Sequence, residues 1–154
     1  MTFFKTSARM PMWLMVCAGL LVSVAPALGQ SMPDTSRIVT LGGSVTETVY
    51  ALGAGDHVVG VDASSVYPAA ATEKPSVGYF RQLPAEGVLS LGPSLVLALE
   101  GTGPPTVLDQ LRSAGVRVEA IPDAPTVEGT TRKIRQIAGL LGREAQGDSL
   151  IRQM

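Results

Sequence analysis

The chain has 154 residues, of which 45% are hydrophobic and 16% are charged, so it has enough apolar material for the core of one domain. Its 12 basic and 13 acidic residues nearly balance, which argues against a nucleic-acid-binding surface because such surfaces carry a basic excess. A single Cys and a single His exclude a zinc site built from several Cys and His ligands.

The N-terminal segment, residues 1–29, has the pattern of a secretory signal. Lys5 and Arg9 precede an apolar run over residues 13–24, and small residues follow at the alternate positions that signal peptidase accepts. The run is short for a membrane span, which needs about 20 residues. We expect a cleaved signal peptide and a mature chain without cysteine; the alternative is a retained N-terminal anchor.

Beyond a polar lead-in at residues 30–36, strands and helices alternate along the chain. Apolar and β-branched runs predict the strands, and apolar residues at helical spacing between Gly and Pro stops predict the helices. In chain order we expect a strand at 37–41, a helix at 44–52, a strand at 57–62, a loop at 64–76, an extended segment at 77–83, a short helix at 85–91, a strand at 94–99, a helix at 106–114, a strand at 116–121, a helix at 126–141 and a further helix from 144. This alternation predicts an α/β fold, a parallel sheet flanked by helices in a Rossmann-like lobe over residues 37–142.

Two of the predicted helices carry capping signals. Ser44 and Glu47 match a capping box, in which each side chain bonds a backbone N–H at the start of the helix. Thr126 is expected to cap the long helix, and Gly142 to end it.

The usual nucleotide-binding and catalytic motifs are missing from the sequence. Gly53 and Gly55 precede a strand, whereas the dinucleotide fingerprint follows one, and Gly42-Gly43 lacks its third glycine. No phosphate-binding loop or Gly-x-Ser-x-Gly elbow occurs, and His57 is expected to be a strand-end surface residue. We therefore do not expect an enzyme.

Three stretches resemble a known family of transport proteins. Residues 37–53, RIVTLGGSVTETVYALG, resemble the opening of periplasmic substrate-binding proteins of the metal-chelate class of ABC importers, which carry haem, siderophores or cobalamin. Residues 89–98, LSLGPSLVLA, are similar to the short helix, Pro turn and strand of that family. Residues 77–88, VGYFRQLPAEGV, resemble its haem-binding branch, and the likeness as a whole runs over residues 37–154.

The resemblance implies that Tyr79 is the axial ligand of haem iron. A phenolate oxygen suits ferric iron, and tyrosine ligation is an established haem mode. In an extended segment Arg81 would point the same way as Tyr79, where it would stabilise the phenolate or pair with a haem propionate, while Phe80 would point away and pack. Residue types alone also allow Tyr79 to be a half-buried loop tyrosine and Arg81 a solvated charge.

Further contacts are expected where strands end, because ligands of open α/β sheets lie beyond the carboxyl ends of the strands. The residues at these positions are Gly42, Gly43, Ser44, Ser64, Ser65, Glu100 and Gly101, with Tyr67 in a neighbouring loop. Of these we select Gly43, Ser44 and Ser65 as ligand-binding residues. The resemblance also implies that Glu86 docks on arginines of the inner-membrane ABC permease; the alternative is a solvated Glu at a helix start.

The family has two lobes joined by a long helix, and residues 143–154 correspond to the start of that helix. We expect the chain to be the N-terminal part of a periplasmic haem-binding protein that delivers haem to an ABC permease, and to bind haem weakly by itself. The first alternative is the same fold carrying a ferric siderophore or cobalamin. A nucleotide-dependent enzyme on a Rossmann-like sheet and an inert partner-binding lobe are further alternatives.

Overall fold

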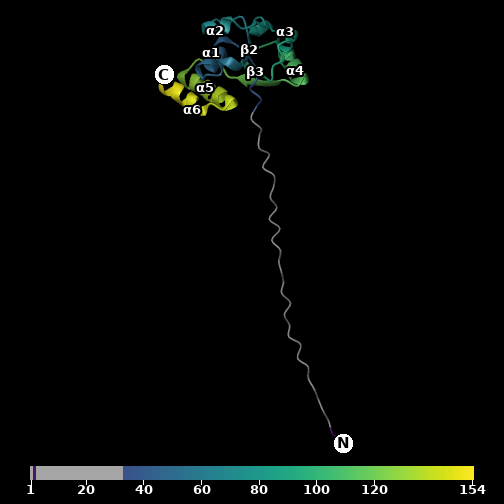
Figure 1. Ribbon diagram of the computed structural model, residues 1–154, viewed down its shortest axis with the longest axis vertical. Helices are drawn as coiled ribbons and strands as arrows, with labels where there is room; N and C mark the ends of the chain where they lie inside the picture. The colour runs from purple at the N-terminus through teal and green to yellow at the C-terminus, as the bar shows by residue number, and fades with distance from the viewer. Residues whose placement is uncertain (1, 3–32) are drawn as a thin grey trace. The chain divides into compact units, whose positions relative to one another are not determined.

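The computed structural model describes residue 2 and residues 33–154 of the chain (Figure 1). The expected signal peptide and the first part of the lead-in lie outside these residues. Within the described region, no helix is long and apolar enough to cross a membrane.

Four parallel strands form the sheet, each within one residue of its predicted bounds at either end. They are β1 (Ile38–Leu41), β2 (Val58–Val61), β3 (Leu95–Leu99) and β4 (Arg117–Ile121), in the order β2-β1-β3-β4. β1 and β3 are buried along their whole length, and for β3 this agrees with its continuous apolar run, which is typical of a central parallel strand. β4 forms an edge of the sheet and is largely exposed or half-buried.

Helices connect the strands and cover both faces of the sheet. They are α1 (Gly43–Ala51), α2 (Ala69–Thr72), α3 (Ala85–Leu89), α4 (Pro105–Ser113), α5 (Val127–Leu141) and α6 (Glu144–Arg152), with single 3-10 turns η1 (Gly55–His57) and η2 (Phe80–Gln82). Right-handed connections between parallel strands place α1 on one face and α3 and α4 on the other. α5 contacts α1, and α6 packs on α5. Figure 1 shows the α3–α4 pair and the α5–α6 pair on opposite sides of the strands. The α/β lobe is therefore confirmed.

One capping prediction is confirmed and one is wrong. Thr126 accepts a hydrogen bond from the Gly129 N–H at 2.9 Å, and Gly142 ends α5 with a φ of 63°. At the start of α1, however, Gly42 is the N-cap and no side chain of the helix caps it, so Ser44 and Glu47 form no capping box. The free N–H groups there bond to residues outside the helix instead, as described below.

Two connecting segments also differ from their predictions. The expected loop at 64–76 contains the short helix α2. The expected extended segment at 77–83 turns into η2 at Phe80, whose side chain is only 7% exposed. The Gln82 N–H bonds to the Tyr79 carbonyl at 2.9 Å and closes this turn. The Phe80 ring packs in the core as expected, but it does so from this turn and not from an extended strand.

Candidate functional site

The carboxyl ends of the four strands meet at one edge of the sheet. The chain leaves β1 toward β2 on one side and leaves β3 toward β4 on the other, so the connections diverge between the two central strands. Ligands of open α/β sheets bind in the crevice at such a point. The candidate site is therefore built from the loops that follow β1, β2 and β3 and from the segment that lies across them.

Gly42 and Gly43 allow these loops to pack closely. Gly42 has a φ of +101°, and a Cβ atom there would lie 2.6 Å from the Cβ of Leu99 at the end of β3. A Cβ on Gly43 would lie 2.8 Å from the Ser64 carbonyl oxygen after β2. The two glycines thus allow the loops after β1, β2 and β3 to approach one another closely, which is a role unrelated to phosphate binding.

Asp62 joins the loop after β1 to the loop after β2. Its carboxylate is 1% exposed and accepts four hydrogen bonds. Oδ1 accepts from the Gly42 N–H at 2.9 Å and from the Ser65 hydroxyl at 2.8 Å. Oδ2 accepts from the N–H of Ser64 at 3.0 Å and from its hydroxyl at 2.7 Å. A buried carboxylate with four donors is well satisfied and holds both loops in one arrangement.

The Asp62 contacts continue into the lobe through hydroxyl groups. Ser65 Oγ lies 2.6 Å from Thr46 Oγ1, which lies 2.8 Å from Thr40 Oγ1 on β1. The Gly43 N–H donates to Ser64 Oγ at 3.1 Å. Two residues predicted to touch a ligand, Gly43 and Ser65, thus have these polar groups committed inside the lobe. The sequence reasoning missed Asp62; its place directly after a buried strand and before two serines was the available signal.

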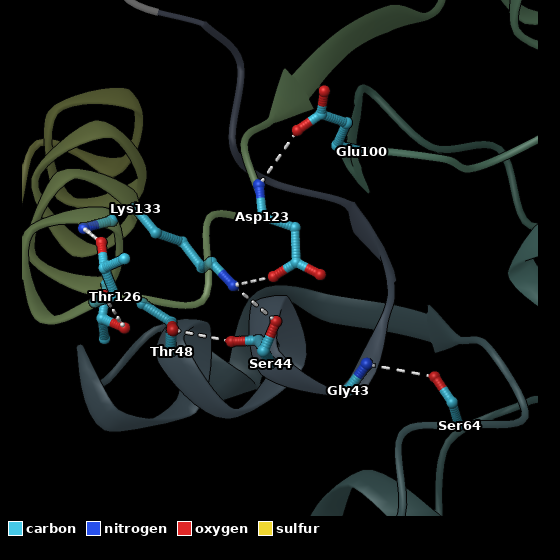
Figure 2. Close-up of polar contacts among 10 residues, drawn as sticks. Gly43, Ser44, Thr48, Ser64, Glu100, Asp123, Thr126 and Lys133 are labelled. Carbon is cyan, nitrogen blue, oxygen red and sulfur yellow. Dashed lines mark hydrogen bonds and ion pairs between the residues drawn. The ribbon is translucent and has the colours of Figure 1, made fainter.

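Lys133 makes a second connection at the same edge, on the side of β3 and β4 (Figure 2). Its ammonium lies 2.8 Å from Asp123 Oδ1 and donates to Ser44 Oγ at 2.9 Å. The Lys133 side chain is 8% exposed and that of Asp123 is 46% exposed. The Asp123 N–H in turn donates to Glu100 Oε2 at 3.3 Å. Ser44, predicted from its position after β1, is therefore exposed at the edge while its hydroxyl is held by a lysine 89 residues away.

The segment that carries Tyr79 lies across this edge and is bonded at both ends. The Ala63 N–H donates to the Gly78 carbonyl at 2.8 Å beside the end of β2. The Gly103 N–H donates to the Phe80 carbonyl, and the Leu83 N–H to the Gly103 carbonyl, both at 2.9 Å, in the loop after β3. These bonds bring Tyr79 and Arg81 to the carboxyl edge, together with the loops that the sequence pointed to.

Tyr79 and Arg81 both contact the buried ring of Phe80. The Tyr79 and Phe80 rings meet edge to face, with centroids 5.1 Å apart and planes at 71°. The Arg81 guanidinium carbon lies 4.9 Å from the Phe80 ring centroid. The expectation that Arg81 follows strand alternation is wrong because it lies in η2. Tyr79 and Arg81 therefore share a contact with the Phe80 ring.

The phenol of Tyr79 and the guanidinium of Arg81 have no polar partner within the described region. Tyr79 is 46% exposed, and its hydroxyl takes part in none of the hydrogen bonds found among residues 33–154. The ion pairs of the same residues join Arg112 to Asp109, Arg117 to Glu119 and Lys133 to Asp123, and none includes Arg81. A phenol and a guanidinium are therefore available at the carboxyl edge.

Several exposed apolar side chains lie in the segments that follow β2 and β4. The large hydrophobic residues that are most exposed between residues 33 and 154 are Val66 (72%), Tyr67 (65%), Tyr79 (46%), Val127 (69%) and Met154 (62%). All except Met154 lie in the segments after β2 or at the start of α5, which follows β4. These segments therefore offer exposed apolar surface to a ligand with an apolar body.

Two remaining residues of interest lie nearby. Tyr67 lines a pocket of about 270 Å³ against α1 with Tyr50, and burial, together with Asp56 and Glu73, raises the pKa of Tyr50. Glu86 is exposed in the first turn of α3. Within the described residues, no three His, Cys, Asp or Glu side chains are grouped to hold a metal ion.

A family model described as periplasmic binding protein matches residues 38–154. The chain belongs to the periplasmic binding protein family. The family and the solved structures that resemble this chain are periplasmic binding proteins and not enzymes, so the expectation of a non-enzyme is confirmed. One relative, the uncharacterised substrate-binding lipoprotein YvrC of Bacillus subtilis (strain 168), is 36% identical over 123 residues, which cover 79% of this chain and 39% of that protein.

Other members of the family carry named ligands. The vitamin B12-binding protein of Yersinia pestis (strain Pestoides F) is 35% identical over 129 residues, covering 84% of this chain and 42% of that protein. A periplasmic heme-binding protein from Pseudomonas aeruginosa superposes with a TM-score of 0.74 at 42% identity, covering 77% of this chain and 42% of that one. RhuT, a periplasmic heme-binding protein from Roseiflexus sp. RS-1, gives a TM-score of 0.74 at 45% identity, covering 77% and 45%. This family member thus spans less than half the length of these relatives.

Proposed function

We propose that this chain binds ferric haem in the periplasm, with Tyr79 as the iron ligand, as part of a protein that delivers haem to an ABC permease. The observation that carries the proposal is that the phenol of Tyr79 and the guanidinium of Arg81, both packed against Phe80 at the carboxyl edge, have no polar partner among residues 33–154. The likeness to heme-binding structures at 42% and 45% identity supports haem as the ligand.

The chemistry of the two side chains fits this role. A tyrosine phenol has an ordinary pKa of about 10, so it ligates at neutral pH only when a cation favours its phenolate. Ferric iron supplies that charge directly, and tyrosine is a known axial ligand of haem iron. The Arg81 guanidinium adds positive charge and pairs with the phenolate or with a propionate of haem.

The apolar residues of the edge supply the rest of the contact. Val66, Tyr67 and Val127 are more than half exposed in the lobe, and burial of apolar surface against a porphyrin is favourable by about 25 cal/mol per Å². A single lobe contacts a porphyrin from one side. We therefore propose that this chain by itself holds haem weakly, with Gly43, Ser44 and Ser65 shaping the floor of the site.

Export and docking complete the proposal. Residues 1–29 would direct the chain through the inner membrane and be removed, and residues 37–142 would form the ligand lobe, with α6 leading into an interlobe helix. Glu86 is exposed on α3 and would pair with arginines of the permease. Such an exposed pair contributes only about 0–1 kcal/mol, so it would orient the complex more than strengthen it.

The vitamin B12-binding relatives favour a second candidate function, the binding of cobalamin or a ferric siderophore. These chelates bring their own ligands for the metal. A protein that carries them has no need of a phenolate at Tyr79, so the two functions differ in what Tyr79 does.

Titration of the protein with hemin tests the proposal. We expect the wild-type protein to develop the charge-transfer absorption of a ferric phenolate, and the Tyr79→Phe variant to lose it. Tyr67→Phe is the matched control, because it removes another exposed phenol of the lobe and should leave the spectrum intact. A wild-type spectrum in Tyr79→Phe would rule out the ligand role. Saturable binding of cyanocobalamin, unaffected by Tyr79→Phe, would favour the second candidate.

A further inference from the structure

We propose that Gly101, acting with Phe80, sets the position of the Arg81 guanidinium and thereby determines how the site recognises the carboxylates of its ligand. Gly101 lies in the loop after β3, and the three atoms nearest to a Cβ built on it all belong to the Arg81 guanidinium. The inference rests on the proposed function insofar as haem is the ligand that presents the carboxylates.

Phe80 provides a fixed platform for the guanidinium. Its ring is 7% exposed, and its carbonyl is held by the Gly103 N–H at 2.9 Å. The Arg81 guanidinium carbon lies 4.9 Å from the ring centroid. Arginine stacks favourably on aromatic faces, and this contact uses none of its N–H donors. A long and otherwise mobile side chain is thereby restricted without losing its capacity to bind an anion.

Gly101 provides the second surface that Arg81 touches. A Cβ atom at Gly101 would lie 3.1 Å from Nη1, 3.6 Å from Cζ and 3.8 Å from Nη2 of Arg81. A methyl group at this position would therefore meet the end of the Arg81 guanidinium before any other group. Gly101 also has a φ of +82°, which L side chains rarely adopt. A methyl group at Gly101 would therefore require the guanidinium to shift by a few tenths of an ångström.

Glu100, the acidic residue next to Gly101, forms no ion pair with Arg81. The carboxylate of Glu100 accepts a hydrogen bond from the Asp123 N–H at 3.3 Å, and no ion pair of residues 33–154 joins it to Arg81. Arg81 thus keeps its planar set of donors for an external partner. A guanidinium held in this way matches a carboxylate through two parallel hydrogen bonds.

The test compares Gly101→Ala with Gly115→Ala. Gly115 is the matched control because its φ of +86° is close to that of Gly101, while a Cβ there would meet no atom within 4 Å. Both substitutions place alanine in the same unfavourable conformation, so we expect similar losses in melting temperature. Only Gly101→Ala places a methyl group against the guanidinium.

The first measurement compares the affinities for hemin and for hemin dimethyl ester, which lacks the carboxylates. We expect the wild type and Gly115→Ala to prefer hemin by about tenfold, the size of one charge-assisted contact. The preference should fall to about threefold or less in Gly101→Ala and in Arg81→Gln. An unchanged preference in Gly101→Ala would overturn the role in recognition.

The second measurement uses the ligand-free protein and separates this inference from the proposed function. The ring current of Phe80 shifts the NMR resonance of the Arg81 Nε–H group, and we expect that shift to change in Gly101→Ala and to persist in Gly115→Ala. A resonance that does not move in Gly101→Ala would overturn the positioning role. If the wild type binds no hemin, the proposed function fails, while this resonance still decides whether Gly101 positions Arg81.

Discussion

Two groups of polar side chains share the carboxyl edge of the sheet and differ in where their hydrogen bonds go. Asp62 is buried and accepts four hydrogen bonds from the neighbouring loops. Tyr79 and Arg81 are exposed, and each packs against the ring of Phe80. The first group holds the loops together, whereas the second presents unused donors and acceptors to a ligand.

The difference follows from the cost of unpaired polar groups. A buried donor or acceptor without a partner costs about 1–3 kcal/mol, so the Asp62 group has to be complete inside the lobe. Exposed groups bond to water and lose little when they have no partner in the protein. Such groups can exchange water for a ligand, which makes exposure without an internal partner a useful mark of a binding residue.

Removing the buried carboxylate should have the largest effect. In Asp62→Ala the Gly42 N–H and the Ser64 and Ser65 hydroxyls lose their acceptor, and we expect the free energy of unfolding to fall by about 3 kcal/mol or more. Urea denaturation followed by circular dichroism measures this change.

Asp56→Ala is the control for the Asp62 experiment. Asp56 is an exposed carboxylate in η1, and its removal should change stability by less than about 0.5 kcal/mol. Equal effects of the two substitutions would mean that the Asp62 contacts add nothing to stability, and the contrast between the two groups would disappear.

The Lys133 connection should give an intermediate effect. Lys133→Met keeps the apolar stem but removes the ion pair to Asp123 and the hydrogen bond to Ser44, and we expect a loss of about 1–2 kcal/mol. Asp123 is 46% exposed and regains water, which limits the loss. Arg112→Met breaks an ion pair whose side chains are 47% and 72% exposed, so it should cost less than about 0.5 kcal/mol in the same denaturation assay. Similar losses for both variants would show that burial of Lys133 is unimportant.

Local patterns in the sequence were enough to predict the sheet and most helix ends. The strands β1 and β3 and the cap at Thr126 depend on patterns among neighbouring residues, and all three predictions were confirmed. The capping of α1 was not predicted correctly, because the N–H of its N-cap residue, Gly42, bonds to a carboxylate 20 residues away. Ser44 and Glu47 have the right spacing for a capping box, but in the fold Asp62 and Ser64 accept the hydrogen bonds of the Gly42 and Gly43 N–H groups.

Some residues of the site could be predicted from the sequence and others could not. The resemblance pointed to Tyr79 and Arg81, and the ends of the strands pointed to Ser44, which the structure brings to the same edge. Lys133 was not found, because a lysine in a long helix carries no local sign that it bonds a serine 89 residues earlier. The turn at η2 was missed because it depends on the burial of Phe80 by distant segments.

The smallest expected effect is the most informative about the exposed group. Tyr79→Phe removes a hydroxyl with no hydrogen bond in the described region, and Arg81→Gln removes an exposed contact with Phe80 that contributes about 0.5 kcal/mol. Each should leave the free energy of unfolding within about 0.5 kcal/mol of the wild type, and the double variant should be nearly additive apart from their shared contact with Phe80. The same denaturation assay measures all three.

A loss of more than about 1.5 kcal/mol in either single variant would assign Tyr79 or Arg81 to the framework and remove the distinction from Asp62. Neutral stability combined with a lost hemin spectrum has the opposite meaning. It would show that these side chains serve a ligand while the fold is maintained by Asp62 and Lys133. Stability and binding would then depend on different residues of the same sheet edge, and substitutions in the exposed group could change the ligand without unfolding the lobe.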